Sequence, residues 1–404
     1  MAGAGLTAAL GLLPVLLPVL PASQAVAAPG DVIRSAQQWV FDMVNVEPAW
    51  QVTEGEGVTI AVVDSGVYPD ISDLTGNVIP GPDLTGLPTS AQNSNWGDHG
   101  TWMASIIAGH GNNGGFDGVM GIAPKAKILS IRVIPDKGDP GYRAYNNEPE
   151  QRIQDELANG IMTAVKDHAR VISMSIGYSA PSGAVRNAIA YADKHGTVLI
   201  ASSGNSGGND TQHGGMAPES FPADYPGVVG VGAVTIDGVP ASFSSGNLSV
   251  EVAAPGKGVP AQGRNGSYYT VDGTSPACAI VAGVAALIES RYPGISPAAV
   301  SQALTSTAQQ TPSGSYDVNT GFGIVNAGAA LEKAGQLVKE RSQASPVPLA
   351  AHFGGGTAAV PAAPVTPRGD GQRVLFIVLA LISLAVAAAG FAGVRMTRGS
   401  RGAR

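Results

Sequence analysis

The sequence predicts an α/β fold: a mainly parallel, doubly wound sheet with helices on both faces, arranged in three layers. Short apolar runs alternate along the chain with longer segments that are amphipathic at helical spacing, and this alternation is typical of βαβ units. The apolar runs are continuous, as expected of strands that are covered on both faces of the sheet. Ligands of such sheets bind at the carboxyl ends of the strands, so polar residues at those ends are the candidates for chemistry.

The predicted elements follow one another from residue 58 onward. Five apolar runs predict buried strands, at residues 58–63, 127–133, 171–176, 197–202 and 228–234. Amphipathic segments predict helices between them, at residues 101–108, 150–167 and 182–194. Two further helices are expected near the end of the body: a small-residue apolar helix over 276–291, and a helix that Ser296 caps and that ends near Thr307.

Composition and charge exclude several classes of protein. An apolar fraction of 44% with 13% charged residues excludes a disordered chain. The formal net charge is −7, although the last ten residues carry four arginines and no acids. A body this acidic is not expected to bind nucleic acid, because such binding depends on Lys and Arg neutralising phosphates. The one cysteine, Cys278, excludes an intramolecular disulfide and is interpreted as a small buried apolar side chain.

The two ends carry apolar segments that are expected to lie outside the fold. An apolar run that ends at Leu20, followed by the small residues Ala25-Val26-Ala27, is typical of a signal peptide, although a basic n-region is missing. The 21 residues of 374–394 carry no charge, and at about 1.5 Å per residue they are long enough to cross a hydrocarbon core of about 30 Å. By the positive-inside rule, the arginines that follow place the C-terminus in the cytoplasm.

These ends predict a single-pass protein of the cell membrane whose body lies on the extracytoplasmic side. The predicted organisation is a signal peptide, an N-terminal extension, a folded body, a Pro/Ala/Gly-rich linker, a transmembrane helix and a basic cytoplasmic tail, at residues 1–27, 28–56, 57–340, 341–373, 374–394 and 395–404. Trp39 and Trp50 indicate that the extension packs on the body rather than forming a separate pro-domain.

Three polar residues at the ends of predicted elements are candidates for catalysis, but each has a structural explanation when taken alone. Asp64 follows the first strand, where it serves equally well as a turn former or a helix cap. His99 opens a helical segment, and capping by Asp98 explains half of its motif. Ser275 precedes Pro276 and an apolar helix, which is a favoured pairing for an ordinary N-cap.

Four motifs together remove much of that ambiguity. VVDSG, GDHGTWMASIIAG, ASSGNSG and DGTSPACAIVAGVAAL occur in the order Asp, His, Asn, Ser, and together they resemble the subtilisin-like serine proteases. The resemblance extends to the segments GIAP, SMSIG, ASFS, APG and GFG, and it covers about residues 49–331. It implies a subtilisin-like fold for residues 57–340 and a serine endopeptidase that hydrolyses protein or peptide substrates through an acyl-enzyme intermediate.

The family resemblance also implies roles for individual residues. Ser275 would be the nucleophile, His99 the base that accepts its proton, and Asp64 the group that orients the imidazole. The side-chain amide of Asn205 and the backbone N–H of Ser275 would stabilise the oxyanion. The segment Ser175, Ile176, Gly177 resembles the edge that pairs with an extended substrate through its backbone.

A rival motif is present but does not fit its required context. Residues 204–208 match G-x-S-x-G, the nucleophile elbow of α/β-hydrolases, with Ser206 as the nucleophile. That elbow needs a helix directly after the serine, whereas a loop with three prolines follows here. Pro276 lacks the N–H that an elbow would need after Ser275, but the subtilisin arrangement uses the N–H of the serine itself.

Two further features leave alternatives open. Residues 135–149 follow a predicted strand and hold Tyr142, Tyr145 and several charges, as either a rim loop of a substrate cleft or an ordinary solvated loop would. No cluster of metal-ligating side chains stands out, so no cofactor is predicted. Calcium held by backbone carbonyls, as in many family members, would leave no signature in the sequence.

The order of segments resembles the mycosins, the actinobacterial proteases associated with type VII secretion. That layout consists of a signal, a protease-like body without a large pro-domain, a Pro/Ala-rich linker, one membrane helix and a short basic tail. Disulfide-bonded mycosins, however, need more cysteines than this chain has. Two functions therefore remain open: an active membrane-anchored endopeptidase, or a mainly structural component of a type VII-like secretion complex in which proteolysis is secondary.

Overall fold

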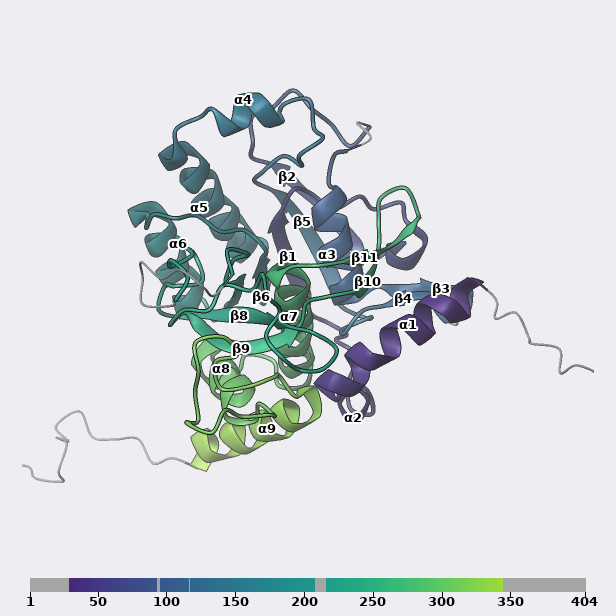
Figure 1. The fold of residues 1–404 in the computed structure, drawn as a ribbon, viewed down its shortest axis with the longest axis vertical. Helices are drawn as coiled ribbons and strands as arrows, with labels where there is room; N and C mark the ends of the chain where they lie inside the picture. The colour runs from purple at the N-terminus through teal and green to yellow at the C-terminus, as the bar shows by residue number, and fades with distance from the viewer. Residues whose placement is uncertain (1–28, 93–94, 116, 208–215, 344–404) are drawn as a thin grey trace, which may run out of the picture. The chain divides into compact units, whose positions relative to one another are not determined.

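The centre of the protein is a seven-stranded sheet in which every pair of neighbouring strands is parallel (Figure 1). The computed structural model describes residues 29–343, apart from 93–94, 116 and 208–215. The strand order is β2-β5-β1-β6-β7-β8-β9. The strands are β1 (Thr59–Asp64), β2 (Val78–Asp83), β5 (Lys127–Arg132), β6 (Val171–Met174), β7 (Val198–Ser202), β8 (Val228–Val234) and β9 (Val250–Pro255). The predicted parallel α/β fold is confirmed.

Helices cover both faces of this sheet, and successive strand residues face opposite cores. Ile60 and Val62 of β1 belong to the core that includes α3 (Asp98–Ala108) and α7 (Thr274–Arg291). Ala61 and Val63 belong to the core formed with α5 (Glu150–Lys166) and α6 (Gly183–Lys194). Because both sets are buried, each central strand must be apolar at almost every position, which explains the continuous apolar runs of the sequence.

Helix α7 runs through the middle of the first core. Its residues from Thr274 to Glu289 are all buried, and it packs against β6, β7, β8, β9 and α3. Small side chains permit this close packing: a Cβ on Gly283 would lie 2.6 Å from the Cβ of Ile122. The next helix, α8 (Pro297–Ser306), begins as predicted, because the Ser296 hydroxyl accepts the Ala299 N–H at 3.4 Å.

The N-terminal extension packs on the body through α1 (Pro29–Val44) and α2 (Glu47–Trp50). The Gln37 side chain bonds both backbone groups of Met120, donating to its C=O at 2.6 Å and accepting its N–H at 3.0 Å. Trp50 packs edge-on against Phe41, with ring centroids 5.1 Å apart, and donates to the Ile122 C=O at 2.8 Å. The extension is therefore part of the folded body.

Smaller elements complete the described residues. They are the two-stranded pairs β3 (His110–Asn112) with β4 (Asp117–Met120) and β10 (Val259–Gln262) with β11 (Tyr268–Val271), the 3₁₀ turns η1 (Ser72–Leu74) and η2 (Asn113–Gly115), and helices α4 (Tyr142–Asn146) and α9 (Ala327–Gln343). The sequence did not predict α9, which runs to Gln343 and thus past residue 341, where the linker was expected to begin.

No helix between residues 29 and 343 is long and apolar enough to cross a membrane. The predicted signal peptide, the predicted membrane span at 374–394 and the basic tail lie outside the described residues.

Candidate active site

The predicted site residues come from element ends that meet at one edge of the sheet. Asp64 is the last residue of β1, and Ser175 and Asn205 follow β6 and β7. Because β1, β6 and β7 are parallel neighbours, their carboxyl ends lie side by side. His99 and Ser275 come from the first turns of α3 and α7, which pack against each other and against this sheet.

Asp64 and His99 form a direct contact. Asp64 Oδ1 lies 2.8 Å from His99 Nδ1, and the same oxygen accepts the Ser65 N–H at 2.6 Å. The Asp64 side chain is buried, while about 30% of the His99 side chain is exposed. Burial works to lower the pKa of His99, but the negative charges of Asp64 and Asp136 outweigh it and raise that pKa above its ordinary value.

Two glycines allow α3 to approach the turn that follows β1. A Cβ on Gly100 would lie 2.2 Å from the Gly66 carbonyl oxygen, so the helix could not pack this closely with a larger residue. Gly66 itself has a φ of +97°, in the left-handed region that favours glycine, and a Cβ there would lie 2.7 Å from the Trp96 ring. The Gly100 N–H bonds the Ser65 hydroxyl at 3.0 Å, which ties the helix to the turn.

The cap of α3 is not the one that the sequence suggested. The helix begins at Asp98 after Gly97, and the Asp98 side chain makes no capping bond. Instead the carboxylate of Asp136 accepts the backbone N–H of Asp98 at 2.8 Å and that of His99 at 3.2 Å. The structural alternative of capping by Asp98 is therefore not what the fold shows. The cap comes from Asp136, in the insert 135–149, which the sequence did not mark out.

Ser275 is not an ordinary helix cap either. Helix α7 begins at Thr274 with Gly273 as its N-cap, so Ser275 is the second helical residue and the structural explanation for it fails. Ser275 and His99 line the same cavity, of about 250 Å³. Within the described residues their side chains do not share a hydrogen bond, and hydrogen bonds of a catalytic base often tighten only when substrate is bound.

Asn205 is held with its amide donors available. Its Oδ1 accepts the Thr274 N–H at 2.9 Å and the Thr274 hydroxyl at 3.0 Å, which fixes the orientation of the carboxamide. Asn205 and Ser275 line a second cavity, of about 410 Å³. The Ser275 N–H lies in the first turn of α7, where backbone donors have no partner within the helix. Two donors are thus placed where an oxyanion could bind.

Replacing Asn205 with alanine is expected to lower kcat about 10²–10³-fold with little change in KM, because it removes one donor that acts on the transition state. Steady-state kinetics on a peptide substrate would measure this. Asn187→Ala, on the exposed face of α6, is the matched control and should leave kcat unchanged. An equal effect of both variants, or a loss confined to KM, would contradict the role of Asn205.

The predicted substrate edge presents its backbone rather than its side chains. Ile176 is only 6% exposed and belongs to the core that includes α5 and α6, so its side chain is not available to a ligand. Gly177 is exposed, and the backbone groups of Ser175 and Gly177 bond no other backbone group of the described residues. The Ser175 hydroxyl donates to the Ser275 C=O at 3.3 Å. Pairing with an extended substrate stays a prediction.

Cys278 is buried in the core, as interpreted from the sequence. Its Sγ lies 3.7 Å from the Ser173 hydroxyl and 3.8 Å from the Met174 C=O. Burial raises the pKa of the Cys278 thiol to about 11, so it is protonated at neutral pH and unsuited to nucleophilic chemistry.

The insert after β5 is not simply a solvated loop. Tyr145 of α4 is buried and its hydroxyl donates to the Val133 C=O at 2.5 Å, so this side chain serves packing rather than a cleft rim. No group of three or more His, Cys, Asp or Glu side chains in the described part of the chain is placed to hold a metal ion.

A buried arginine that the sequence analysis did not single out supports the turn after Asp64. The Arg132 side chain is 1% exposed and donates to Asp139 at 2.9 Å and to Asp83 at 2.5 Å. Its Nε donates to the Ser65 C=O at 3.2 Å, directly after Asp64. An arginine inside an apolar strand was the available signal, because burying its charge is costly unless it is paired.

Replacing Arg132 with methionine is expected to lower the free energy of unfolding by about 3–5 kcal/mol, because two carboxylates would lose their buried partner. Chemical denaturation would measure this change. Arg143→Met, at an exposed position of α4, is the control and should change stability by less than about 0.5 kcal/mol. Equal losses in the two variants would show that Arg132 does not hold this turn.

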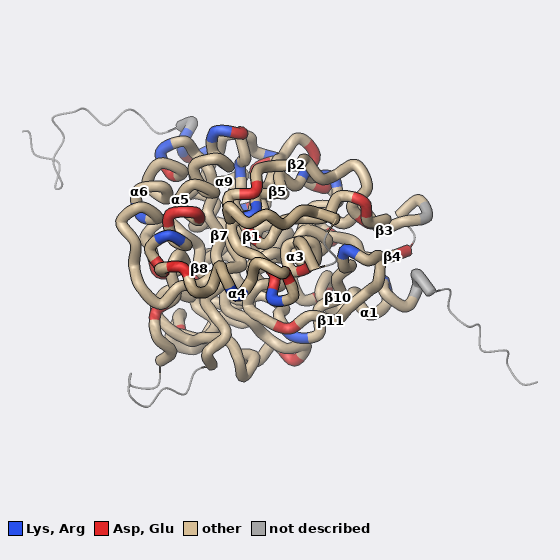
Figure 2. The backbone as a smooth tube through the Cα atoms, turned by 90° about the horizontal axis from the view of Figure 1, so that it is seen from above, with Lys and Arg blue, Asp and Glu red and all other residues tan. Residues whose placement is uncertain are grey.

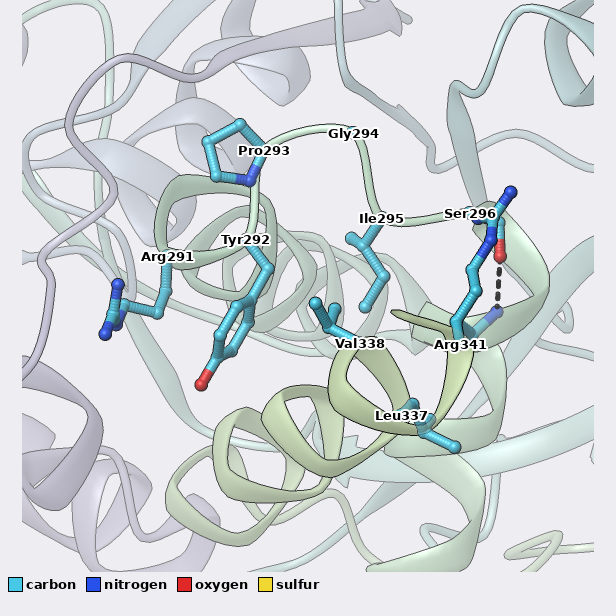
Figure 3. A pocket seen from close by; sticks show the side chains of 10 residues that line it. Arg291, Tyr292, Pro293, Gly294, Ile295, Ser296, Leu337, Val338 and Arg341 are labelled. Carbon is cyan, nitrogen blue, oxygen red and sulfur yellow. Dashed lines mark hydrogen bonds between the residues drawn. The ribbon is translucent and has the colours of Figure 1, made fainter. Parts of the chain in front are cut away.

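A hollow of about 350 Å³ lies between the connection from α7 to α8 and the end of α9 (Figure 3). Its apolar lining includes Ile295, Leu337 and Val338, and Arg291 and Arg341 flank it. None of the predicted site residues lines this hollow, so it is separate from the edge that holds Asp64 and His99.

Lys and Arg lie interspersed with Asp and Glu along the described backbone in the view of Figure 2.

Known proteins resemble the chain over most of this fold. The model of the Subtilase family, peptidase S8, matches residues 55–324. Thermitase of Thermoactinomyces vulgaris is 34% identical over 305 residues, which cover 75% of this chain and 99% of thermitase. Two solved structures are similar: MycP1, a serine protease described as an essential component of the type VII (ESX-1) secretion system, and the MycP3 protease from the ESX-3 system. The MycP1 structure has a TM-score of 0.60 and 31% identity, and the similarity covers 72% of this chain and 88% of MycP1. The MycP3 structure has a TM-score of 0.60 and 28% identity, and the similarity covers 76% of this chain and 90% of MycP3.

Proposed function

Because the chain belongs to the subtilase family and is a serine-type endopeptidase, we propose that Asp64, His99 and Ser275 form its catalytic triad. The observation that carries this proposal is the 2.8 Å contact between Asp64 and His99, together with the cavity that His99 and Ser275 line in common. The matching residues of the family's motifs support the same roles.

In the proposed reaction, Ser275 Oγ attacks the carbonyl carbon of the scissile peptide bond while His99 takes the hydroxyl proton. The Asn205 amide and the Ser275 N–H stabilise the resulting oxyanion. The C–N bond then breaks as His99 gives its proton to the leaving amine, which leaves an acyl-enzyme on Ser275. Water, deprotonated by His99, hydrolyses this ester and regenerates the hydroxyl. Asp64 stabilises the imidazolium throughout.

A fluorophosphonate probe on the full chain tests the nucleophile directly. The wild-type protein is expected to be labelled covalently, and Ser275→Ala is expected to remain unlabelled, because the probe reacts with an activated serine hydroxyl. Labelling of both proteins, or of neither, would contradict the assignment of Ser275.

We further propose that the peptidase is a single-pass membrane protein whose catalytic body faces the extracytoplasmic side. The uncharged segment 374–394 and the arginines after it support this orientation. The Pro/Ala/Gly-rich composition of residues 344–373 supports a tether on the order of 30 Å in span, which would keep the active site close to the membrane. Single cysteines placed before residue 344 and after residue 394, in a Cys278→Ser background, should react with an impermeant thiol reagent on opposite sides of the membrane.

A mycosin-type role in a type VII-like secretion complex is the second candidate. Similarity to MycP1 and MycP3, together with the order of segments in the sequence, favours it. If the role is mainly structural, Ser275→Ala should restore secretion to cells that lack the chain as well as the wild type does. Failure of this inert variant to restore secretion would show that proteolysis is required.

A further inference from the structure

Asp136 follows β5 and reaches the first turn of α3, the helix that carries His99. Its carboxylate accepts two successive backbone N–H groups, that of Asp98 at 2.8 Å and that of His99 at 3.2 Å. A carboxylate in this position satisfies donors that have no partner within the helix and is favoured by the helix dipole. The contact thus holds the backbone of the residue whose side chain meets Asp64.

Asp136 and the turn after β1 hold His99 from two sides. The Gly100 N–H, next in sequence, bonds the Ser65 hydroxyl at 3.0 Å, and Ser65 also interacts with Asp136. Three successive N–H groups of α3 therefore end on groups fixed at the carboxyl ends of β1 and β5, which are neighbours in the sheet. A shift of this helix turn would move the imidazole relative to Asp64 Oδ1.

Some of the surroundings of Asp136 disfavour its ionised form, and others favour it. Burial, followed by the negative charge of Asp64, raises the pKa of Asp136 to about 6, against the bonds from His99 and Ser65 that lower it. Asp98 lies one residue before His99 on α3. On the β5 side, the Arg132 guanidinium is engaged with Asp83 and Asp139, and the exposed Lys137 follows Asp136. Asp136 therefore changes charge in the pH range in which histidines do.

We propose that Asp136 is a positioning residue for catalysis. It holds the His99 backbone in the place from which the imidazole meets Asp64, and it adds a second negative charge that stabilises the imidazolium. This rests on the proposed role of His99 as the general base. It differs from a purely structural cap because the charge of Asp136 contributes to the proton affinity of His99, so removing that charge changes the pH dependence of the reaction and not only its rate.

The pH profile of the wild-type protein tests the proposal without any variant. As pH falls, His99 becomes protonated and activity declines with a slope of one in log(kcat/KM) against pH. Below about pH 6, Asp136 also becomes protonated, so it loses its negative charge and keeps only one carbonyl oxygen as a full acceptor for the two α3 N–H groups. The slope should therefore rise from one toward two. A slope that stays at one down to pH 4.5 would overturn the proposal.

Asp136→Asn provides the second test. An amide of the same size keeps one acceptor and loses the charge, so kcat/KM at pH 8 is expected to fall about 10–100-fold, as for the loss of hydrogen bonds to a charged group. The midpoint of the acid limb should move to lower pH, because His99 loses a charge that raises its pKa. The slope of that limb should be one.

Asp98→Asn is the matched control, since it removes a carboxylate one residue from His99 that makes no bond to the helix N–H groups. It is expected to keep the wild-type midpoint and slope. A uniform fall in kcat/KM for Asp136→Asn, with its acid limb unmoved, would identify a merely structural role. If labelling by the fluorophosphonate probe did not depend on Ser275, the proposed function would fail instead, so the two failures are distinguishable.

Discussion

Replacing Ser275 with alanine is expected to lower turnover of a peptide substrate about 10⁶-fold without disturbing the fold. The hydroxyl that forms the acyl-enzyme is lost, while Asn205 and the backbone N–H at position 275 remain. The residual rate, about 10³–10⁴-fold above that in water, should come from these donors and from substrate binding. Because the Ser275 side chain caps no helix, its removal should cost little stability.

The measurement is kcat on a fluorogenic peptide, with the thermal midpoint of unfolding as the control for folding. A variant with a normal midpoint and near-normal kcat would show that Ser275 is not the nucleophile. If activity survived in Ser275→Ala and was lost in Ser206→Ala, the G-x-S-x-G elbow would be the site instead.

Asp64→Asn is expected to lower kcat about 10⁴-fold, the second largest effect of a single substitution. In the wild-type protein, the 2.8 Å contact between Asp64 Oδ1 and His99 Nδ1 favours the tautomer with its proton on Nδ1, so that Nε2 can accept the serine proton. An amide in that place would present a donor to Nδ1 and favour the opposite tautomer. It would also remove the carboxylate with the larger effect of the two that raise the pKa of His99, so the acid limb of the pH profile should move to lower pH.

The control for this variant is Asp237→Asn, an exposed aspartate after β8 that should keep wild-type turnover. A pH profile from 4.5 to 9 would separate the two effects of Asp64→Asn, loss of rate at the plateau and displacement of the acid limb. If kcat fell by less than tenfold, the contact between Asp64 and His99 would not be catalytic.

The strands that were predicted correctly share one physical property. Strands such as β1 and β8 are buried on both faces, so their sequences are apolar at nearly every position. Strand β2 lies at the edge of the sheet, is largely exposed and contains two prolines, so its sequence VIPGPD carries no such signal. Edge strands are recognised by pairing, which the sequence alone does not display.

Helix α9 was missed although a local signal was present. Asn326 precedes it, and its side chain accepts the Ala329 N–H at 3.0 Å, as an N-cap does. The segment that follows is rich in Ala, Leu, Glu, Lys and Gln, which are strong helix formers. Its position beside the Pro/Ala/Gly-rich linker masked this pattern.

The candidate site was predicted from motif order, and the parts that were missed depend on contacts across the fold. Asp136 is 37 residues from the N–H group of His99 that it accepts, and β5 lies beside β1 only because of the strand order of the sheet. The rule that pointed to Asp64, a polar residue at the carboxyl end of a buried strand, applies equally to Asp136. Asp136 lies four residues past the end of β5, and no family motif marks that position.

The two halves of the proposed site have unequal mechanical support. Ser275 is carried by a helix whose residues are buried from Thr274 to Glu289, so this helix cannot detach without dismantling the core. Helix α3 is also buried from Gly100 onward, apart from Trp102, but His99 lies before that part, in a first turn whose N–H groups are held by the Asp136 carboxylate. Loss of the Asp136 contact would therefore loosen this turn while the core around α7 stays intact. Inactivation by acid or mild denaturant should begin at the histidine, while the serine is still in its native place.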